Sequence, residues 1–329
     1  MQEDLAQVSI FSKLESHSGP CLIDKSGNAL QYSQMKDICL TFRNQFSNME
    51  IEKGSVFGIV LPNGINMAKC FLAVANYVTA APLNPNYTEE EFIFYLEDLE
   101  CKYVITDESA SNNLKNAAKK TNTKLVFIEA DDEDNPLKLK SIDAKKNITI
   151  KSNSNNDQCL ILHTSGTTSK PKQVQLSTKN ILSSASNIAN TLQLSKADKG
   201  LNIMPLFHIH GLIASLLSSV FSGGCLVCTD GFNALGLFSQ IKTFKPTWIT
   251  AVPTMYQAIL GRSSRNSSII KSSQIRFLRS SSAAMPVKTI EELEAVFECP
   301  VIEAYGMTEA SHQMASNPIN GIRKSEKIS

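Results

Sequence analysis

The chain has 329 residues, of which 42% are hydrophobic and 19% charged, and its formal net charge is +1. This length suffices for two or three packed subdomains, and the composition is that of an ordinary globular protein. A net charge so close to zero gives no basic footprint for nucleic acid or an anionic membrane. Any anion must therefore be bound by local groups of residues.

The N-terminal letters MQEDLAQVSIF are acidic and lack the basic-then-apolar layout of a signal peptide. An uncharged run at 209–229 is broken by serines and by Gly223 and Gly224, which favours a short helix, a turn and a strand over a membrane-spanning helix. Eight cysteines are scattered at irregular intervals, as is typical of buried thiols in a reducing compartment. We therefore expect a cytoplasmic protein without a membrane span and leave its oligomeric state open.

Residues 1 to about 128 alternate helix-like and strand-like segments. The letters SVFGIVLPNG indicate a buried strand and a turn, followed by a helix from Ile65 to about Tyr77. TEEEFIFYLEDL predicts a helix with Thr88 as N-cap and three glutamates in its first turn. The apolar residues that suit one face of this helix are Phe92, Ile93, Tyr95 and Leu96. KYVITD and KLVFIE are short apolar strands at the spacing of βαβ units.

A polar stretch at 129–157 separates two parts of the chain. It has few large apolar residues and many charges and asparagines, which predicts a boundary or a mobile connection. We accordingly expect an α/β protein with one subdomain at 1–150 and a second at 151–329.

After this boundary a strand, a small polar loop and a helix recur. The strands begin in QCLILH, LNIMPLFHIHG, TWITAVPT, IRFLRSSSAAMP and CPVIEAYGMTEASH. One of the helices is expected from Pro286 to Phe297, with proline in its first turn and Val287, Ile290 and Leu293 on its apolar face. In an open α/β sheet such loops gather at the carboxyl ends of the strands, where ligands bind.

The loop in LHTSGTTSKPKQVQLS, residues 162–177, predicts a phosphate-binding site between a strand and a helix capped by Ser177. Gly166 permits a backbone nest of inward N–H groups, hydroxyl side chains add donors, and Lys170 or Lys172 can lie near the anion. It is not a Walker A loop, because no glycine precedes either lysine.

Two motifs carry a family resemblance. LHTSGTTSKPK resembles the phosphate loop, and AYGMTEASH the second nucleotide motif, of the adenylate-forming superfamily of acyl-CoA synthetases, peptide-synthetase adenylation domains and luciferases. PLFHIHGL and LPNGINMAKCFLAVANYVTAAPLNPNYT also match, so the resemblance covers essentially the whole chain. It implies the layered α/β/α N-terminal core of that superfamily, with two related parallel-sheet subdomains. It also implies an acid–CoA ligase that forms AMP from ATP, with Mg²⁺, coenzyme A and a small carboxylic acid as its ligands.

The resemblance also implies roles for individual residues. Thr164 to Thr168 would wrap the β- and γ-phosphates, Tyr305 would stack on adenine, and His208 would gate the acyl pocket. The implied nucleotide-binding residues are Thr164, Ser165, Gly166, Thr167, Thr168, Ser282, Ala283, Ala284, Glu303, Ala304, Tyr305, Gly306 and Thr308. The implied catalytic residues are Thr308, Glu309, His208 and Lys172, with Thr308 on the α-phosphate and Glu309 and Thr164 on Mg²⁺. The implied acid-binding residues are His208, His210, Ser281, Ser282 and His312.

The sequence departs from the family pattern in its phosphate loop and at its end. Ser169 and Gln173 stand where the loop most often has glycine, and glutamine there is expected to tighten the loop. The family's later motifs, including a lysine near the C-terminus, have no counterpart before Ser329. We therefore expect the N-terminal portion of a ligase, without the small C-terminal domain, and little or no activity from this portion by itself.

The acid is expected to be small and polar, with oxalate as the leading candidate. EAYGMTEASHQMASNP resembles the oxalate–CoA ligases, and Ser280 to Ser282 with the histidines would leave unpaired polar groups beside a long acyl chain. If those serines face water instead, coumarate or a medium-chain fatty acid would fit.

Two other classes of protein remain as alternatives. A metal hydrolase would use His208 and His210 on one face of a strand with Glu309 and His312 on a helix, although no second E-x-x-H is present. A nucleotide-binding module without catalysis is the other class. The lone C-x-x-C at 225–228 is expected to be strand core rather than a redox or zinc site.

Overall fold

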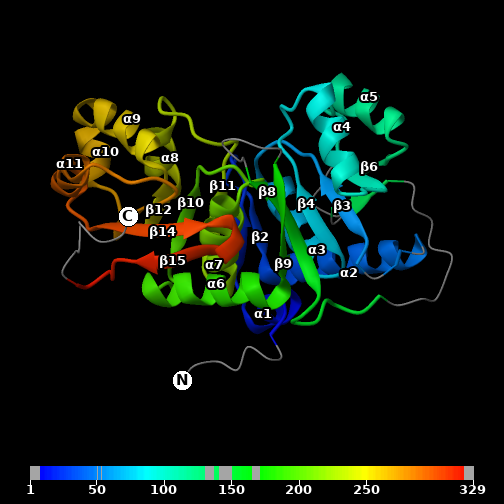
Figure 1. Ribbon diagram of the computed structural model, residues 1–329. Coiled ribbons are helices and arrows are strands. Elements are labelled where there is room, and N and C mark those ends of the chain that lie inside the picture. The colour runs from blue at the N-terminus through cyan, green and yellow to red at the C-terminus, as the bar shows by residue number, and fades with distance from the viewer. Residues whose placement is uncertain are drawn as a thin grey trace. The chain divides into compact units, whose positions relative to one another are not determined.

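The computed structural model describes residues 8–49, 51–52, 54–129, 137–140, 150–164 and 171–321. The chain forms two compact units, one of residues 1–18 and 31–179 and the other of residues 19–30 and 180–329. Each unit is built on one sheet in which most neighbouring strands are parallel (Figure 1). The expected α/β fold is confirmed.

The first unit contains a seven-stranded sheet in the order β7-β6-β5-β3-β4-β8-β9. Its strands are β3 (Val56–Ile59), β4 (Thr79–Pro82), β5 (Tyr103–Thr106), β6 (Lys124–Glu129), β7 (Lys138–Leu139), β8 (Gln158–Thr164) and β9 (Lys172–Ser177). Its helices are α1 (Ile10–Ser16), α2 (Tyr32–Asn48), α3 (Ile65–Ala75), α4 (Glu89–Asp98) and α5 (Asn112–Lys120).

Helices cover both faces of this first sheet. The Phe57 ring of β3 lies 4.9 Å from the Phe46 ring of α2, measured between centroids. Val60 packs instead in a buried cluster with Phe92 of α4 and Leu114 of α5. Because side chains an odd number of residues apart on an extended chain point to opposite faces, α2 lies on one face and α4 and α5 on the other. The unit therefore has the α/β/α layering that the resemblance implied.

Helix α4 begins as the sequence predicts. Thr88 Oγ1 accepts a hydrogen bond from the Glu91 backbone N–H at 3.2 Å, and the Glu91 carboxylate accepts one from the Thr88 N–H at 2.8 Å. This capping box satisfies two backbone donors that the first turn leaves without helical partners. Phe92 and Leu96 are buried, so the predicted apolar face is confirmed.

The second unit contains an eight-stranded sheet in the order β15-β14-β13-β12-β10-β11-β1-β2. Its strands are β1 (Pro20–Ile23), β2 (Ala29–Gln31), β10 (Lys199–Asn202), β11 (Cys225–Cys228), β12 (Trp248–Ala251), β13 (Phe277–Ser280), β14 (Val301–Met307) and β15 (His312–Ser316). Its helices are α6 (Thr178–Thr191), the π-helix η2 (His210–Leu217), α7 (Ser218–Phe221), α8 (Leu237–Phe244), α9 (Pro253–Ser263), η3 (Ser264–Asn266), α10 (Ser267–Lys271), α11 (Val287–Phe297) and η4 (Thr308–Ala310).

Helices α8 to α11 lie on one side of this sheet, and α6 and α7 lie on the other (Figure 1). A buried cluster joins Phe238 of α8, Ile259 of α9 and Leu293 of α11 to strand residues such as Leu201 and Leu278. The expected helix near Pro286 is present with Pro286 as its N-cap, but Val287 is exposed rather than part of the buried face.

Helix α6 begins at Thr178, directly after Ser177, as expected, but residues 172–177 form a strand, and residues 312–316 form a strand instead of the expected helix. Strand β9 follows the loop after β8 and pairs antiparallel with β8, and β15 pairs in the same way with β14. In β9 the buried residues Val174 and Leu176 alternate with Gln173 and Gln175, which is the period of a strand. Each sheet therefore ends in an antiparallel hairpin that carries one of the two nucleotide motifs.

The polar stretch at 129–157 belongs in part to the first unit. Strand β7 pairs antiparallel with β6, and Leu139 is buried and exchanges two hydrogen bonds with the Gln45 side chain. The buried Asn153 donates to the carbonyls of Ala75 and Val78. The two units consequently divide near Lys179 rather than at residue 150, because β8 and β9 complete the first sheet.

The uncharged run at 209–229 forms η2, α7, a turn and β11, as expected. Cys225 and Cys228 are buried in β11, which confirms strand core at the C-x-x-C. Within the described ranges, no helix has both the length and the apolar character needed to cross a membrane.

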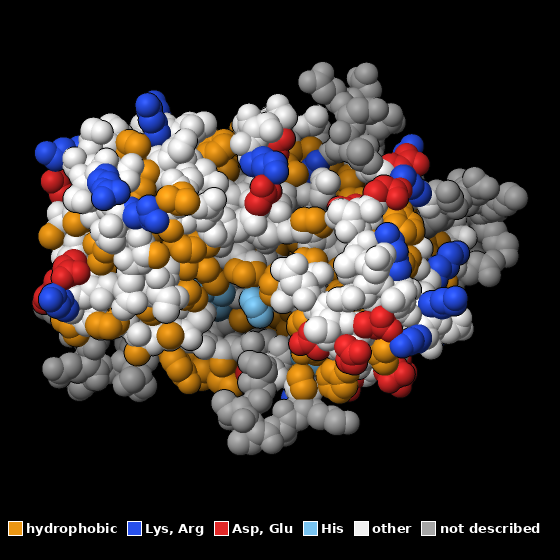
Figure 2. Space-filling view, turned by 90° about the horizontal axis from the view of Figure 1, so that it is seen from above, with side chains coloured by type: hydrophobic (Ala, Val, Ile, Leu, Met, Phe, Trp, Pro, Cys, Tyr) orange, Lys and Arg blue, Asp and Glu red, His pale blue; other side chains and the backbone are white. Residues whose placement is uncertain are grey.

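Charges of both signs are interspersed on the face shown in Figure 2. Ion pairs of this kind are exposed: Lys25 and Asp230 lie 2.8 Å apart with about two thirds of each side chain accessible. Such pairs contribute little stability, because water screens them.

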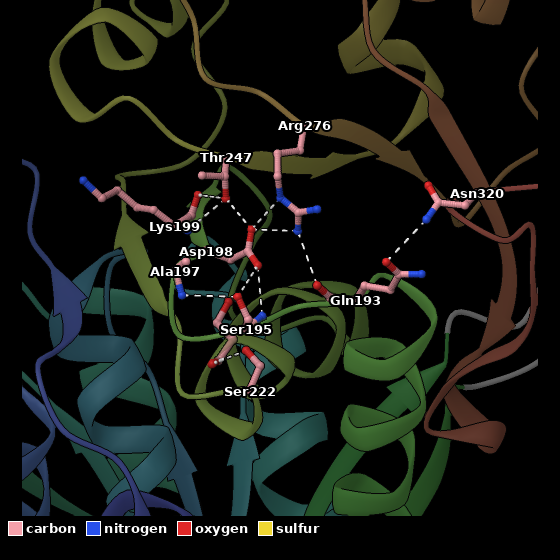
Figure 3. A network of polar contacts seen from close by, with 10 residues as sticks. Gln193, Ser195, Ala197, Asp198, Lys199, Ser222, Thr247, Arg276 and Asn320 are labelled. Carbon is pink, nitrogen blue, oxygen red and sulfur yellow. Dashed lines mark hydrogen bonds and ion pairs between the residues drawn. The ribbon is translucent and has the colours of Figure 1, made fainter.

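Asp198 is a buried exception, at the start of β10 in the second unit (Figure 3). Its carboxylate accepts from Thr247 Oγ1 at 2.8 Å, from Arg276 Nε at 2.9 Å and from the Ser195 N–H at 2.9 Å. Thr247 Oγ1 also accepts from the Lys199 N–H at 3.0 Å, so one carboxylate connects the segments that lead into β10, β12 and β13. This network lies at the amino ends of the strands, opposite the edge where the candidate site is found.

Candidate functional site

The base of the phosphate-loop hairpin is part of the first unit. Thr164 at the end of β8 pairs with Lys172 at the start of β9; Thr164 is half-buried and Lys172 is exposed. The expected phosphate ligands Ser165, Gly166, Thr167 and Thr168 lie outside the described residues. The structure therefore places the two ends of the loop.

Three polar side chains fasten this hairpin base to α4. His163 Nε2 lies 2.8 Å from the Asp98 carboxylate, and Gln173 Nε2 donates to the same carboxylate at 2.9 Å and to the Asp98 carbonyl. His163 and Gln173 are directly opposite each other in the hairpin. Gln173 thus holds the root of the loop on α4, in keeping with the expected tightening.

In the second unit, the loop after β10 carries two histidines in different settings. His208 is exposed, and His210 is buried at the start of η2. Gly211 permits this arrangement, because a Cβ there would lie 2.2 Å from the Pro205 carbonyl oxygen. The histidines therefore lie on a turn and a π-helix, not on the strand face that a metal hydrolase would use.

The loop after β13 begins with one anchored serine and one exposed serine. Ser281 is buried and donates to the Ala304 carbonyl at 2.8 Å. Ser282 is exposed with a φ of 75°, a conformation that serine seldom adopts, and Ala283 and Ala284 are exposed after it. Strained backbone of this kind clusters at functional sites.

The second nucleotide motif forms the hairpin of β14, η4 and β15. A Cβ on Gly306 would lie 1.9 Å from the His312 carbonyl oxygen, at a point where the strand register shifts. Only glycine fits this close approach. Beside it Tyr305 is 47% exposed, Glu303 is half-buried and Ala304 is buried. An exposed aromatic ring held on a rigid hairpin suits stacking on a base.

Thr308 and Glu309 lie in η4, and His312 begins β15, so Glu309 and His312 do not share the helix that the metal hydrolase would need. Glu309 is exposed, and its carboxylate pairs with no other described residue. A carboxylate is the kind of hard oxygen donor that Mg²⁺ prefers, so Glu309 fits that ion.

Residues from three segments meet at the carboxyl edge of the second sheet. His210 Nδ1 lies 3.0 Å from Ser282 Oγ, and the rings of His210 and His312 are 4.9 Å apart between centroids. Burial lowers the pKa of both imidazoles well below the usual value, with the Arg279 guanidinium as a second cause. Both are therefore neutral at pH 7 and able to act as hydrogen-bond donors without charge.

The sequence reasoning missed Arg279 and Thr250 beside these histidines. His210 Nε2 lies 2.6 Å from Thr250 Oγ1, and Arg279 Nη1 lies 3.2 Å from the same oxygen. The available signal was the second arginine of the letters IRFLRS, which follows the apolar pair Phe277 and Leu278 within a short strand. No group of three or more metal-ligating side chains is found within the described ranges.

The model of the family described as "AMP-binding enzyme" matches residues 15–329. The chain belongs to the AMP-binding enzyme family. It is 39% identical over 279 residues to an oxalate–CoA ligase of Arabidopsis thaliana, a match covering 83% of this chain and 54% of that protein. It is 35% identical over 327 residues to an oxalate–CoA ligase of Saccharomyces cerevisiae, covering 90% and 60%. The chain thus spans little more than half the length of these curated relatives of the AMP-binding family.

Solved structures share this AMP-binding fold. An anthranilate–CoA ligase in complex with anthranoyl-AMP superposes with a TM-score of 0.84 at 19% identity, covering 97% of this chain and 63% of that chain. ATP-bound MatB from Rhodopseudomonas palustris superposes with a TM-score of 0.80 at 22% identity, covering 96% and 62%. At these identities the likeness shows the fold alone.

Proposed function

We propose that this chain is the nucleotide- and acid-binding portion of an acid–CoA ligase that activates a carboxylic acid as its acyl-adenylate and transfers it to coenzyme A. The observation that carries the proposal is the meeting of His210, Ser282 and His312 beside the second-motif hairpin of an AMP-binding enzyme. These segments are far apart in the sequence, and they meet where an α/β sheet binds its ligands.

In the first half-reaction a carboxylate oxygen attacks the α-phosphorus of ATP, and pyrophosphate leaves with the electrons of the broken P–O bond. In the second, the coenzyme A thiol attacks the acyl carbon and AMP leaves. Both donor and acceptor are anionic in the first step, so the protein has to offset their repulsion. Bound Mg²⁺ would neutralise phosphate charge, and Glu309 would supply it with a carboxylate ligand.

The chain's own residues supply orientation and hydrogen-bond donors. Tyr305 would stack on adenine, and Thr308 would donate to the α-phosphate. Lys172 and the hydroxyls and amides of 164–168 would bind the β- and γ-phosphates, while His208, exposed on its turn, would border the acyl pocket. The Ser281 bond to Ala304 supports this arrangement, because it ties the loop after β13 to the strand that carries Tyr305.

We propose oxalate as the acid. The exposed Ser282 hydroxyl and the buried His312 imidazole, whose Nδ1 has no hydrogen-bond partner, are polar groups that a second carboxylate can satisfy and an alkyl chain cannot. Similarity to two oxalate–CoA ligases supports the same acid. Coumarate and medium-chain fatty acids are the alternative acids.

We propose a cytoplasmic location, which the free thiols of the eight buried cysteines support.

The test is an acid-dependent ATP–pyrophosphate exchange assay on a protein that contains this chain and has the full length of the curated relatives. Oxalate, malonate, coumarate and octanoate are compared at equal concentration, and oxalate is expected to give the highest exchange. A preference for coumarate or octanoate would replace oxalate with the alternative. Exchange with none of these acids would leave a nucleotide-binding module without catalysis.

A further inference from the structure

Arg279 is a buried cation without an acidic partner. It lies on β13 with no exposed surface, and among the described residues no carboxylate pairs with it. Its Nη2 donates to the Gln313 side-chain oxygen at 3.0 Å, and its Nε has no hydrogen-bond partner. Burial lowers the pKa of Arg279 to about 10, so the guanidinium remains charged at neutral pH. A buried, uncompensated charge is costly and therefore calls for a reason.

The neighbours of Arg279 define the protonation of His210. A guanidinium can only donate, so Thr250 Oγ1 accepts from Arg279 Nη1 at 3.2 Å. Arg279 Nη1 also faces His210 Nε2 at 3.5 Å, so Nε2 is the acceptor on this side and takes the Thr250 hydroxyl proton at 2.6 Å. With donors on this side, Nε2 carries the lone pair and the single ring proton is on Nδ1.

The chain of donors ends at the site. His210 Nδ1 donates to Ser282 Oγ at 3.0 Å, so the Ser282 hydroxyl proton is left to point outward from an exposed side chain. The four residues Arg279, Thr250, His210 and Ser282 are called the donor chain below. Next to the donor chain, Nδ1 of the buried His312 ring has no hydrogen-bond partner. Two polar atoms here, Arg279 Nε and His312 Nδ1, are therefore buried without a partner.

We propose that Arg279 is a positioning residue that determines the specificity for the acid. Through Thr250 and His210 it fixes Ser282 as a hydrogen-bond donor, and its uncompensated positive charge favours an acid with a second carboxylate. The inference rests on the proposed ligase function and explains how that site would distinguish a dicarboxylate from a monocarboxylate. The field of a buried charge reaches the site through a medium of low dielectric, so direct contact with the acid is not required.

The kinetic test compares oxalate with glyoxylate, a monocarboxylate of nearly the same size, in the protein at the length of its relatives. Arg279→Met is expected to lower kcat/KM for oxalate at least about 10-fold more than for glyoxylate. Arg279→Lys, which keeps the charge, should restore much of the oxalate preference. The matched control is Arg265→Met, because Arg265 is exposed and its loss changes the net charge equally. Equal oxalate-to-glyoxylate ratios in the two Met variants would overturn the proposal.

Thr250→Val provides a second variant that keeps the cation, the volume and the fold but removes the link between Arg279 and His210. It is expected to lower kcat for oxalate while leaving part of the preference over glyoxylate, because the charge remains. If Arg279→Met does not fold, Arg279→Lys and Thr250→Val carry the test. An unchanged kcat in Thr250→Val would overturn the role of the donor chain.

A second readout needs no activity. Nitrogen-15 NMR of the 329-residue chain should show His210 neutral with its proton on Nδ1, with the signals assigned from a His210→Gln spectrum. In Thr250→Val these signals should shift, and a buried residue with only a packing role would not move them. Added oxalate should perturb the His210 and His312 signals more than glyoxylate does. A protonated His210, or an equal response of these signals to both acids, would overturn the inference about Arg279 even if the enzyme proves to be a ligase. The expected spectra together with no turnover would overturn the proposed ligase function alone.

Discussion

His210 and His312 illustrate how burial decides what a side chain can do. Each is 2% exposed, and each has a pKa well below the usual value because an imidazolium there would lose its hydration. A histidine elsewhere on the surface would serve as a proton acceptor near neutral pH. Here the two rings act as fixed neutral donors or acceptors instead.

This burial predicts how stability depends on pH. In the unfolded chain both imidazoles bind protons near pH 6.5, whereas in the folded protein they do so only at much lower pH. The unfolded state then binds more protons, so the free energy of unfolding should fall as the pH is lowered from about 7 to about 5. Urea unfolding of the 329-residue chain at both pH values measures this change. His312→Gln should show a smaller difference between the two pH values than the parent, and an equal difference would contradict the assignment.

Glu309 offers a prediction about the metal. Its exposed carboxylate is not engaged by another described side chain, so its removal should cost activity rather than stability. Glu309→Gln in the protein at the length of its relatives is expected to lower adenylate formation by roughly 100-fold or more, the scale of losing a preorganised electrostatic group. The control is Glu292→Gln on the exposed surface of α11. Unchanged turnover with the same dependence on Mg²⁺ would refute the role of Glu309.

At the scale of elements, two antiparallel hairpins position the motifs. The β8–β9 hairpin is fastened to α4 through Asp98, and the β14–β15 hairpin is closed tightly at Gly306. Both the Asp98 contacts and the close approach at Gly306 stabilise the base of a hairpin.

Gln173 is expected to stabilise the base of the β8–β9 hairpin. Gln173→Gly removes two hydrogen bonds to Asp98, so amide hydrogen exchange in residues 158–177 should accelerate and stability should fall by about 1–2 kcal/mol. Gln175→Gly is the matched control, because Gln175 is exposed on the same strand and, among the described residues, its side chain makes no hydrogen bond to α4. Equal acceleration in the two variants would mean that glycine itself, rather than the lost contact, loosens the hairpin.

Asp198 connects the amino ends of the strands in the second unit. Asp198→Asn leaves Arg276 without its anion and weakens the bonds from Thr247 and Ser195, so we expect a loss of about 3 kcal/mol in the free energy of unfolding. The exposed pair supplies the control: Asp230→Asn should cost about 1 kcal/mol or less. Chemical denaturation of both variants measures the two values, and similar losses would contradict the importance of burial.

At the scale of the whole molecule, the two motifs belong to different units. The phosphate-loop hairpin is part of the first sheet, and the second nucleotide motif with the proposed acid-binding residues is part of the second. The donor chain lies entirely in the second unit. Substitutions in the donor chain should therefore change acid selection more than ATP affinity.

We expect the 329-residue chain to bind ATP but to form adenylate slowly. Its units bury their own cores, but the match covers only 54% of the Arabidopsis thaliana relative and 60% of the Saccharomyces cerevisiae relative. Calorimetry with ATP, together with single-turnover adenylation, compares this chain with the protein at the length of its relatives. Adenylation at the same rate in both would show that the additional length is dispensable.

Local patterns in the sequence determined the helices, the parallel strands and the residue types of the motifs. The capping box at Thr88, the helix after Pro286 and the strand core at Cys225 depend on neighbours within a few residues, which the letters contain. The two nucleotide motifs were recognised for the same reason. Strand β9 was missed because residues 172–177 were assigned to the loop before α6, although the alternation in KQVQLS has the period of a strand. Strand β15 was missed because a helix was expected in its place.

Only the tertiary structure decided which residues act together. Arg279, Thr250 and His210 come from β13, β12 and the start of η2, and their hydrogen bonds exist because parallel strands bring these positions to one edge. The neutral state of the histidines depends on burial by surrounding segments, which no local pattern encodes. The boundary near Lys179 likewise follows from the pairing of β8 with β4, because hydrogen bonding between distant strands, not composition, assigns a segment to a sheet.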